Sequence, residues 1–239
     1  MLKIRNTAIG IAGLALIAGC GTGEYKSRLQ ATLVRAGQTA KFDLHLHATT
    51  TDFSASGREK PGVSVRLPKL FDGSANNAIG QLKLLALPGF WYSMEKLHRD
   101  ASGKNLAVYV GFGWVPKADK KEADLQAELL AQLKASLPNA AWQDVKAETP
   151  QGGTVDLKML SGTGPQDFNT GAEDKPVEKV EGQYRLYLVP GSNDHVLIAW
   201  RGPVAAADFW QSVDVAMGTV KIESLPPPAK DAAAAQPAA

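Results

Sequence analysis

The sequence predicts an α+β fold with a mainly antiparallel sheet, and three observations lead to this prediction. Short runs of alternating apolar and polar residues recur along the middle of the chain, several of them joined by turn-rich segments. Two longer stretches, at about 118–137 and 205–221, carry apolar residues at helical spacing instead. Strands in runs, with one helix near the middle and one at the end, are typical of α+β domains.

The first strands are predicted close to the start of the domain. Residues 42–47 alternate between apolar and polar side chains, which predicts a half-buried strand with His45 and His47 on its polar face. Residues 63–67 repeat the pattern. The leucine-rich segment 82–87 fits either a strand or a short buried helix, and we favour the strand.

Three hairpins follow from pairs of β-prone runs that flank turn-rich segments. The paired runs are 91–99 with 106–115, 142–148 with 154–160, and 184–189 with 195–200. The segment 161–175 is rich in glycine and acids, so we expect a loop there.

The two principal helices each carry an apolar face. The central helix, 118–137, has Asp119 or a neighbour as its expected N-cap and ends before Pro138. Its apolar stripe consists of Leu125, Leu129, Leu133 and Leu137. The corresponding face of the last helix consists of Phe209, Val213, Met217 and Val220. Each stripe predicts packing against a sheet.

These elements place a single globular domain at residues 41–224. The preceding segment, 20–40, is polar and has too few spaced apolar residues to predict an element, so we interpret it as a tether. The tail 225–239 begins with a triple proline and continues with an alanine-rich run, which predicts disorder. The prolines could form a docking motif, but a spacer is the simpler interpretation.

Residues 1–19 have the pattern of a signal peptide. Lys3 and Arg5 precede an apolar run from residue 7 to residue 18. A run of this length is shorter than the ~20 residues that a membrane-spanning helix needs. We therefore expect cleavage rather than a permanent span.

The end of this run, Ile17-Ala18-Gly19-Cys20, resembles the lipobox of bacterial lipoproteins. The resemblance implies that the Cys20 thiol receives a diacylglycerol thioether and that the peptide bond before it is cut. It also implies fatty acylation of the new amine, so that two or three acyl chains, such as palmitate, hold the protein on a membrane. Gly21 rather than Asp follows, which by analogy favours the outer membrane over the inner one. The alternatives are a secreted protein with a chance cysteine at its cleavage site, or a cysteine buried in a core.

The charge of the mature chain argues against nucleic acid as a partner. Lys3 and Arg5 are two of the 26 basic residues, so 24 remain against 24 acids. Nucleic-acid binding needs several phosphate contacts from a basic surface. Cys20 is the only cysteine, so no disulfide can form within the chain.

The order hairpin, helix, hairpin, hairpin, helix over residues 41–222 resembles the PsbP-like superfamily of α-β-α sandwiches. This resemblance rests on element order and on no signature motif. It implies a binding or assembly domain without catalytic residues and without a cofactor.

The motifs of common hydrolases, metalloproteases and nucleotide-binding loops are absent from the sequence. The one ligand-like pair is His45 and His47, since alternate strand residues can hold two imidazoles on one metal. Further ligands would come from Asp43, His98, His195 or an acid of segment 173–181.

Three functions are therefore compared. The first is a lipid-anchored envelope protein, facing the periplasm or the exterior, whose non-catalytic domain binds a protein or a small ligand. The second is a metal-binding domain built on His45 and His47. The third is an assembly factor whose C-terminal tail reaches a neighbour.

Overall fold

The computed structural model describes residues 22–52, 62–72, 90–100, 102–191 and 193–223. It confirms the α+β prediction: these residues form three helices and two antiparallel sheets. None of these helices is long and apolar enough to cross a membrane. The lipobox at 17–20, the segment 82–87 and the tail 225–239 lie outside the described residues.

The larger sheet has six strands in the order β3-β4-β8-β7-β6-β5, and every pair is antiparallel. Its strands are β3 (Phe90–Arg99), β4 (Asn105–Pro116), β5 (Ala141–Glu148), β6 (Thr154–Asn169), β7 (Val177–Pro190) and β8 (Asp194–Pro203). All three predicted hairpins are confirmed. Strands β5 to β8 form a meander that returns to β4, so the connection between β4 and β5 has to cross the sheet.

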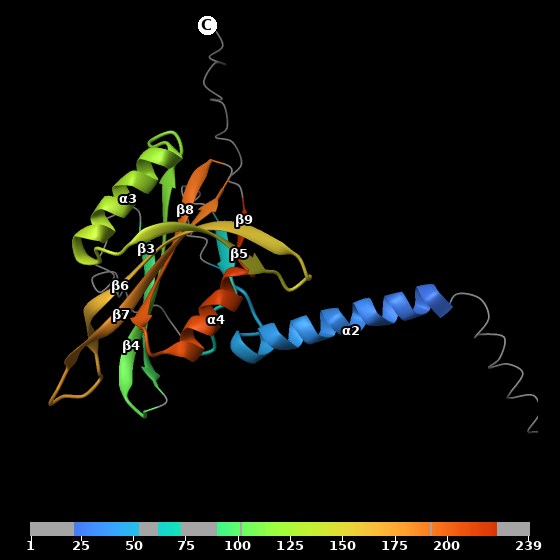
Figure 1. Ribbon diagram of the computed structural model, residues 1–239, viewed down its shortest axis with the longest axis horizontal. Coiled ribbons are helices and arrows are strands. Elements are labelled where there is room, and N and C mark those ends of the chain that lie inside the picture. The colour runs from blue at the N-terminus through green and yellow to red at the C-terminus, as the bar shows by residue number, and fades with distance from the viewer. Residues whose placement is uncertain (1–21, 53–61, 73–89, 101, 192, 224–239) are drawn as a thin grey trace, which may run out of the picture.

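Helix α3 (Glu122–Ser136) makes that connection and covers one face of the sheet (Figure 1). The predicted leucine stripe is confirmed, since all four side chains are at most 1% exposed. They pack with residues of β4, β6, β7 and β8, among them Tyr109, Leu160, Leu186 and Leu197. The helix starts later than predicted, after Lys121 rather than Asp119, because Asp119 N–H bonds the carbonyl of Pro116 in a turn.

The opposite face of the sheet is covered by three elements. They are α4 (Ala207–Met217), the C-terminal end of α2 (Thr22–His45), and a small sheet of β1 (Thr51–Asp52), β2 (Gly62–Val65) and β9 (Lys221–Glu223). The apolar face predicted for the last helix is confirmed for Phe209, Val213 and Met217, which are buried in one cluster with Trp200. The helix predicted to 221 ends at Met217, so Val220 lies beyond it, just before β9. The body therefore has helices on both faces of its sheet.

The loop predicted at 161–175 is wrong, because β6 continues through it to Asn169 and pairs with β7. Its glycines have a packing role in the strand. A Cβ on Gly162 would lie 3.0 Å from Leu137 Cβ and 3.1 Å from Ala140 Cβ, and one on Gly164 would lie 3.0 Å from Leu137 Cδ2. Glycine lets the end of α3 approach the sheet closely.

The strand predicted at 42–47 is also wrong, and the segment before it, for which the sequence predicted no element, is helical. Residues 22–45 form the single helix α2. Phe42 and Leu46 are four residues apart and both buried, whereas Leu44 between them is 70% exposed. Residues spaced by four lie on one side of a helix. Phe42 and Leu46, which matched a strand together with Leu44, therefore also match the buried side of the last helical turn.

Candidate functional site

The two histidines singled out in the sequence lie at the end of α2 and just beyond it. His45 Nδ1 is 3.3 Å from Ser212 Oγ of α4, and the backbone carbonyl of His47 accepts a 2.7 Å hydrogen bond from Arg66 Nε. The strand that would have aligned their imidazoles is not formed. Asp43, a proposed further ligand, is instead ion-paired with Arg66 at 2.5 Å.

A cavity of about 490 Å³ lies where α2, α4 and β3 meet. It brings together His45 and His98, two of the residues that the sequence suggested as metal ligands. The other lining residues are Leu44, Pro68, Lys69, Leu70, Arg99, Asp208, Phe209 and Ser212. His195, a further candidate, lies elsewhere, and in the described part of the chain no three potential ligands lie close enough together to hold a metal ion.

In this α2–α4 cavity the serine already has a partner, and the buried histidine lies beside an acid. His98 is buried, with Nε2 3.1 Å from Asp208 Oδ1 and its ring packed near Phe209. Ser212 Oγ donates to the backbone carbonyl of Asp208 at 2.8 Å. A serine nucleophile would instead donate its proton to the imidazole that activates it. The pair His45 and Ser212 therefore lacks the arrangement of a catalytic dyad.

The charges of the α2–α4 cavity suit an anionic group. Lys69 and Arg99 are both exposed at its rim, with Asp208 as the acid facing them. His45 and His98 add two imidazoles that can donate hydrogen bonds. The sequence could not show this cavity, because its walls come from segments up to 168 positions apart (Leu44 and Ser212).

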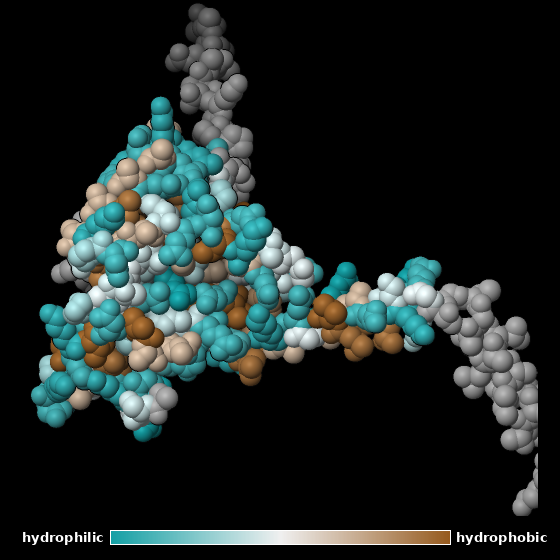
Figure 2. Space-filling model, viewed as in Figure 1, coloured by the Kyte–Doolittle hydropathy of each residue, from teal (hydrophilic) through white to brown (hydrophobic). Residues whose placement is uncertain are grey.

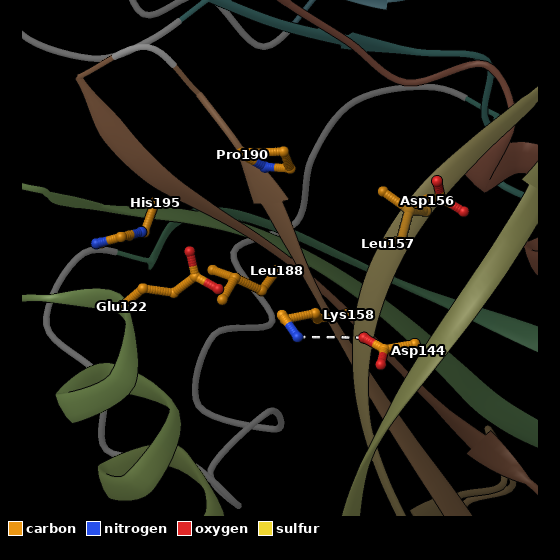
Figure 3. A pocket seen from close by; sticks show the side chains of 8 residues that line it. All are labelled: Glu122, Asp144, Asp156, Leu157, Lys158, Leu188, Pro190 and His195. Carbon is orange, nitrogen blue, oxygen red and sulfur yellow. Dashed lines mark hydrogen bonds and ion pairs between the residues drawn. The ribbon is translucent and has the colours of Figure 1, made fainter.

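A second cavity, of about 340 Å³, lies beside the N-terminal end of α3. Figure 3 shows Glu122 and His195 on one side of it, Leu188 between, and Lys158 paired with Asp144 on the other side. Leu157, Pro190 and Asp156 complete its lining. The Lys158–Asp144 pair is 3.1 Å long, and His195 Nε2 lies 2.9 Å from the carbonyl oxygen of Lys120.

This second cavity has an apolar base and acidic walls. Three carboxylates face one lysine, so it would favour a cationic or hydrogen-bond-donating group over an anion. Next to His195, Asp194 is 5% exposed, and burial raises the pKa of its carboxyl group. The two cavities therefore differ in the sign of the charge that they would accept.

Sequence reasoning missed the buried Arg201 of β8. Its Nε bonds Gln166 Oε1 at 2.8 Å, and its guanidinium lies 5.1 Å from the ring centre of Tyr109 and 4.6 Å from that of Phe168. Burial in this cluster raises the pKa of Tyr109 to about 12. A single arginine within the apolar run 195–203 was the available signal. Tyr109 and Phe168 belong to the apolar core on the α3 side of the sheet, and no residue of this cluster lines either cavity.

Comparison with known proteins adds no relative, since neither the protein-family models nor the curated proteins give a match to this chain.

Proposed function

We propose that the protein is a lipid-anchored bacterial envelope lipoprotein whose domain binds another envelope component without catalysing a reaction. The observation that carries the proposal is the segment Ile17-Ala18-Gly19-Cys20 at the end of a short apolar run. A cysteine at that position offers the sulfur that forms a thioether with diacylglycerol. Two or three acyl chains give stable membrane attachment, which one chain alone does not.

The position of α2 supports this proposal. The helix begins at Thr22, two residues after Cys20, and its 24 residues span about 36 Å at 1.5 Å per residue. Figure 1 shows that it extends away from the body and meets it only near its C-terminal end. An acylated Cys20 would therefore lie at the far end of α2 from its own domain.

The cavities support binding over catalysis. Among the groups that would be candidates for chemistry, Ser212 donates its proton to a backbone carbonyl and Lys158 is ion-paired with Asp144. A PsbP-like domain, which the element order resembles, would also act by binding or assembly. We place the binding surface at the α2–α4 cavity, whose rim carries Lys69 and Arg99.

The anchor is tested by growing cells with labelled fatty acid and comparing the wild type with Cys20→Ala. The wild type should be labelled and processed, whereas the variant should accumulate as a larger unlabelled precursor. A labelled or normally processed variant would refute the anchor.

The binding surface is tested by co-purification from detergent-solubilised membranes. Lys69→Glu should lose the partner because it reverses a charge at the rim of the α2–α4 cavity. Lys158→Glu, in the second cavity, is the matched control and should retain it. Equal retention by both variants would contradict this placement.

A further inference from the structure

Helix α2 carries an exposed apolar face that nothing in the described structure covers. At about 100° per residue, six positions fall within an arc of roughly 100°. We call them the α2 stripe, which consists of Tyr25, Leu29, Leu33, Ala36, Ala40 and Leu44. The four large members are between 45% and 70% exposed. Figure 2 shows hydrophobic side chains along one edge of the projecting helix.

Most of the helix lacks the contacts that usually stabilise a helix in a protein. Residues 23–37 are all exposed, and the segment includes Gly23, Gly37, Thr32 and Val34, which are poor helix formers. Most helical stability in proteins comes from the packing of an apolar face. A helix of this composition therefore needs a surface for its stripe.

The spacing of the α2 stripe makes it complementary to itself. The intervals are 4, 4, 3, 4 and 4 residues, so the pattern is the same when read in either direction about its midpoint between Val34 and Arg35. Two antiparallel copies would place Leu33 opposite Ala36 and Leu29 opposite Ala40. In these pairs a large side chain meets a small one, which allows close packing.

The antiparallel direction also suits the shape of the molecule. Figure 1 shows a body much wider than the helix at one end of α2. Parallel helices would bring the two bodies together at the same end of the pair and would place Ala36 and Ala40 opposite their own copies, so that small side chains meet small ones. They would also place Lys26 and Arg28 beside their own copies. Antiparallel helices keep the bodies at opposite ends.

We propose that the α2 stripe is the docking surface for a second copy of this chain, which forms a two-fold symmetric antiparallel helix pair. Such an interface uses the same patch on both subunits. It goes beyond the proposed function and does not require acylation. In a membrane-anchored protein the pair would lie along the bilayer, with one Cys20 near each end.

Disulfide trapping tests the pairing and its direction. The full chain with Cys20→Ser has no thiol, because Cys20 is its only cysteine. Mixing Leu29→Cys with Ala40→Cys in that background should give a disulfide-linked heterodimer under mild oxidation. Each variant alone should stay uncrosslinked, because its two copies would lie about 16 Å apart along the axis, well beyond the ~7 Å limit of a disulfide. Crosslinking of Leu29→Cys alone would show parallel pairing and overturn the proposal.

Two neighbouring charge substitutions test the face used. Leu33 is 62% exposed on the α2 stripe, and Val34 is 60% exposed outside it, about 100° further round the helix. In sedimentation equilibrium, Leu33→Asp should weaken the dimer about tenfold or more by burying a charge, and Val34→Asp should leave it unchanged. A monomeric wild-type chain would overturn the proposal, and binding of that monomer to lipid vesicles would identify the bilayer surface as the occupant instead.

Discussion

Leu129 lies at the centre of the layer between α3 and the sheet, and truncating it tests the packing of that layer. Its side chain is 0% exposed, with Leu125 and Leu133 one turn away on either side. Leu129→Ala removes three carbon atoms, which corresponds to about 2.4 kcal/mol at ~0.8 kcal/mol per buried CH₂. The cavity left behind adds to this, so the expected loss of unfolding free energy is about 2–5 kcal/mol.

The assay is urea unfolding followed by tryptophan fluorescence. The transition midpoint should fall while its denaturant dependence stays constant, since the surface exposed on unfolding hardly changes. Leu130→Ala is the matched control, because Leu130 is only partly buried beside the same cluster and should cost clearly less. A loss below ~0.5 kcal/mol for Leu129→Ala would refute the assigned packing face.

Three further predictions concern other parts of the domain. The double variant His45→Ala, His47→Ala should melt close to the wild type, and zinc should shift the melting temperature of neither protein. A zinc-dependent rise in the wild-type melting temperature that the variant loses would restore the metal hypothesis. Burial raises the pKa of the Asp194 carboxyl group, so the stability contributed by its neutral form is fully present below pH 3.8 and is lost as the pH rises through the raised value. Asp194→Asn should therefore stabilise the domain at neutral pH but not in acid. Equal effects in urea titrations at both pH values would contradict this. A Cβ on Gly218 would lie 1.7 Å from the Glu148 carbonyl oxygen, so Gly218→Ala should lower the melting temperature by several degrees. Gly37→Ala is the control: a Cβ on Gly37 meets nothing within 4 Å, so this variant should not lower the melting temperature.

The main sheet and its two covering helices could be predicted because their signals are local. The turn before β4 places Gly103 at a φ of 84°, and the turn between β5 and β6 places Gly152 at 86°. Such backbone angles favour glycine, so turn-rich segments mark the hairpins. The leucines of α3 recur every four residues, and no strand periodicity competes with that spacing.

The start of the domain could not be predicted because its pattern is ambiguous. Phe42, Leu44 and Leu46 fit a strand by alternation, while Phe42 and Leu46 alone fit one side of a helix. Packing into the core decides between them, since it buries those two residues and leaves Leu44 exposed. The α2–α4 cavity could not be predicted either, because His45 and His98 come together only through the fold.

The buried strand β6 shows a different limit of sequence reasoning. Gly162, Gly164 and Pro165 are typical of loops, yet they lie in a strand paired with β7. The glycines serve the close approach of Leu137 and Ala140. Sequence composition cannot separate a glycine required by a turn from one required by a neighbouring helix.

The measurement that tests the central proposal most directly is mass spectrometry of the N-terminal peptide of the protein purified from membranes. A lipoprotein should yield a peptide that begins at Cys20 and carries the added mass of diacylglycerol, with a further fatty acyl group where the amine is modified. A peptide that begins at another residue, or an unmodified Cys20 in the membrane-derived protein, would contradict the account.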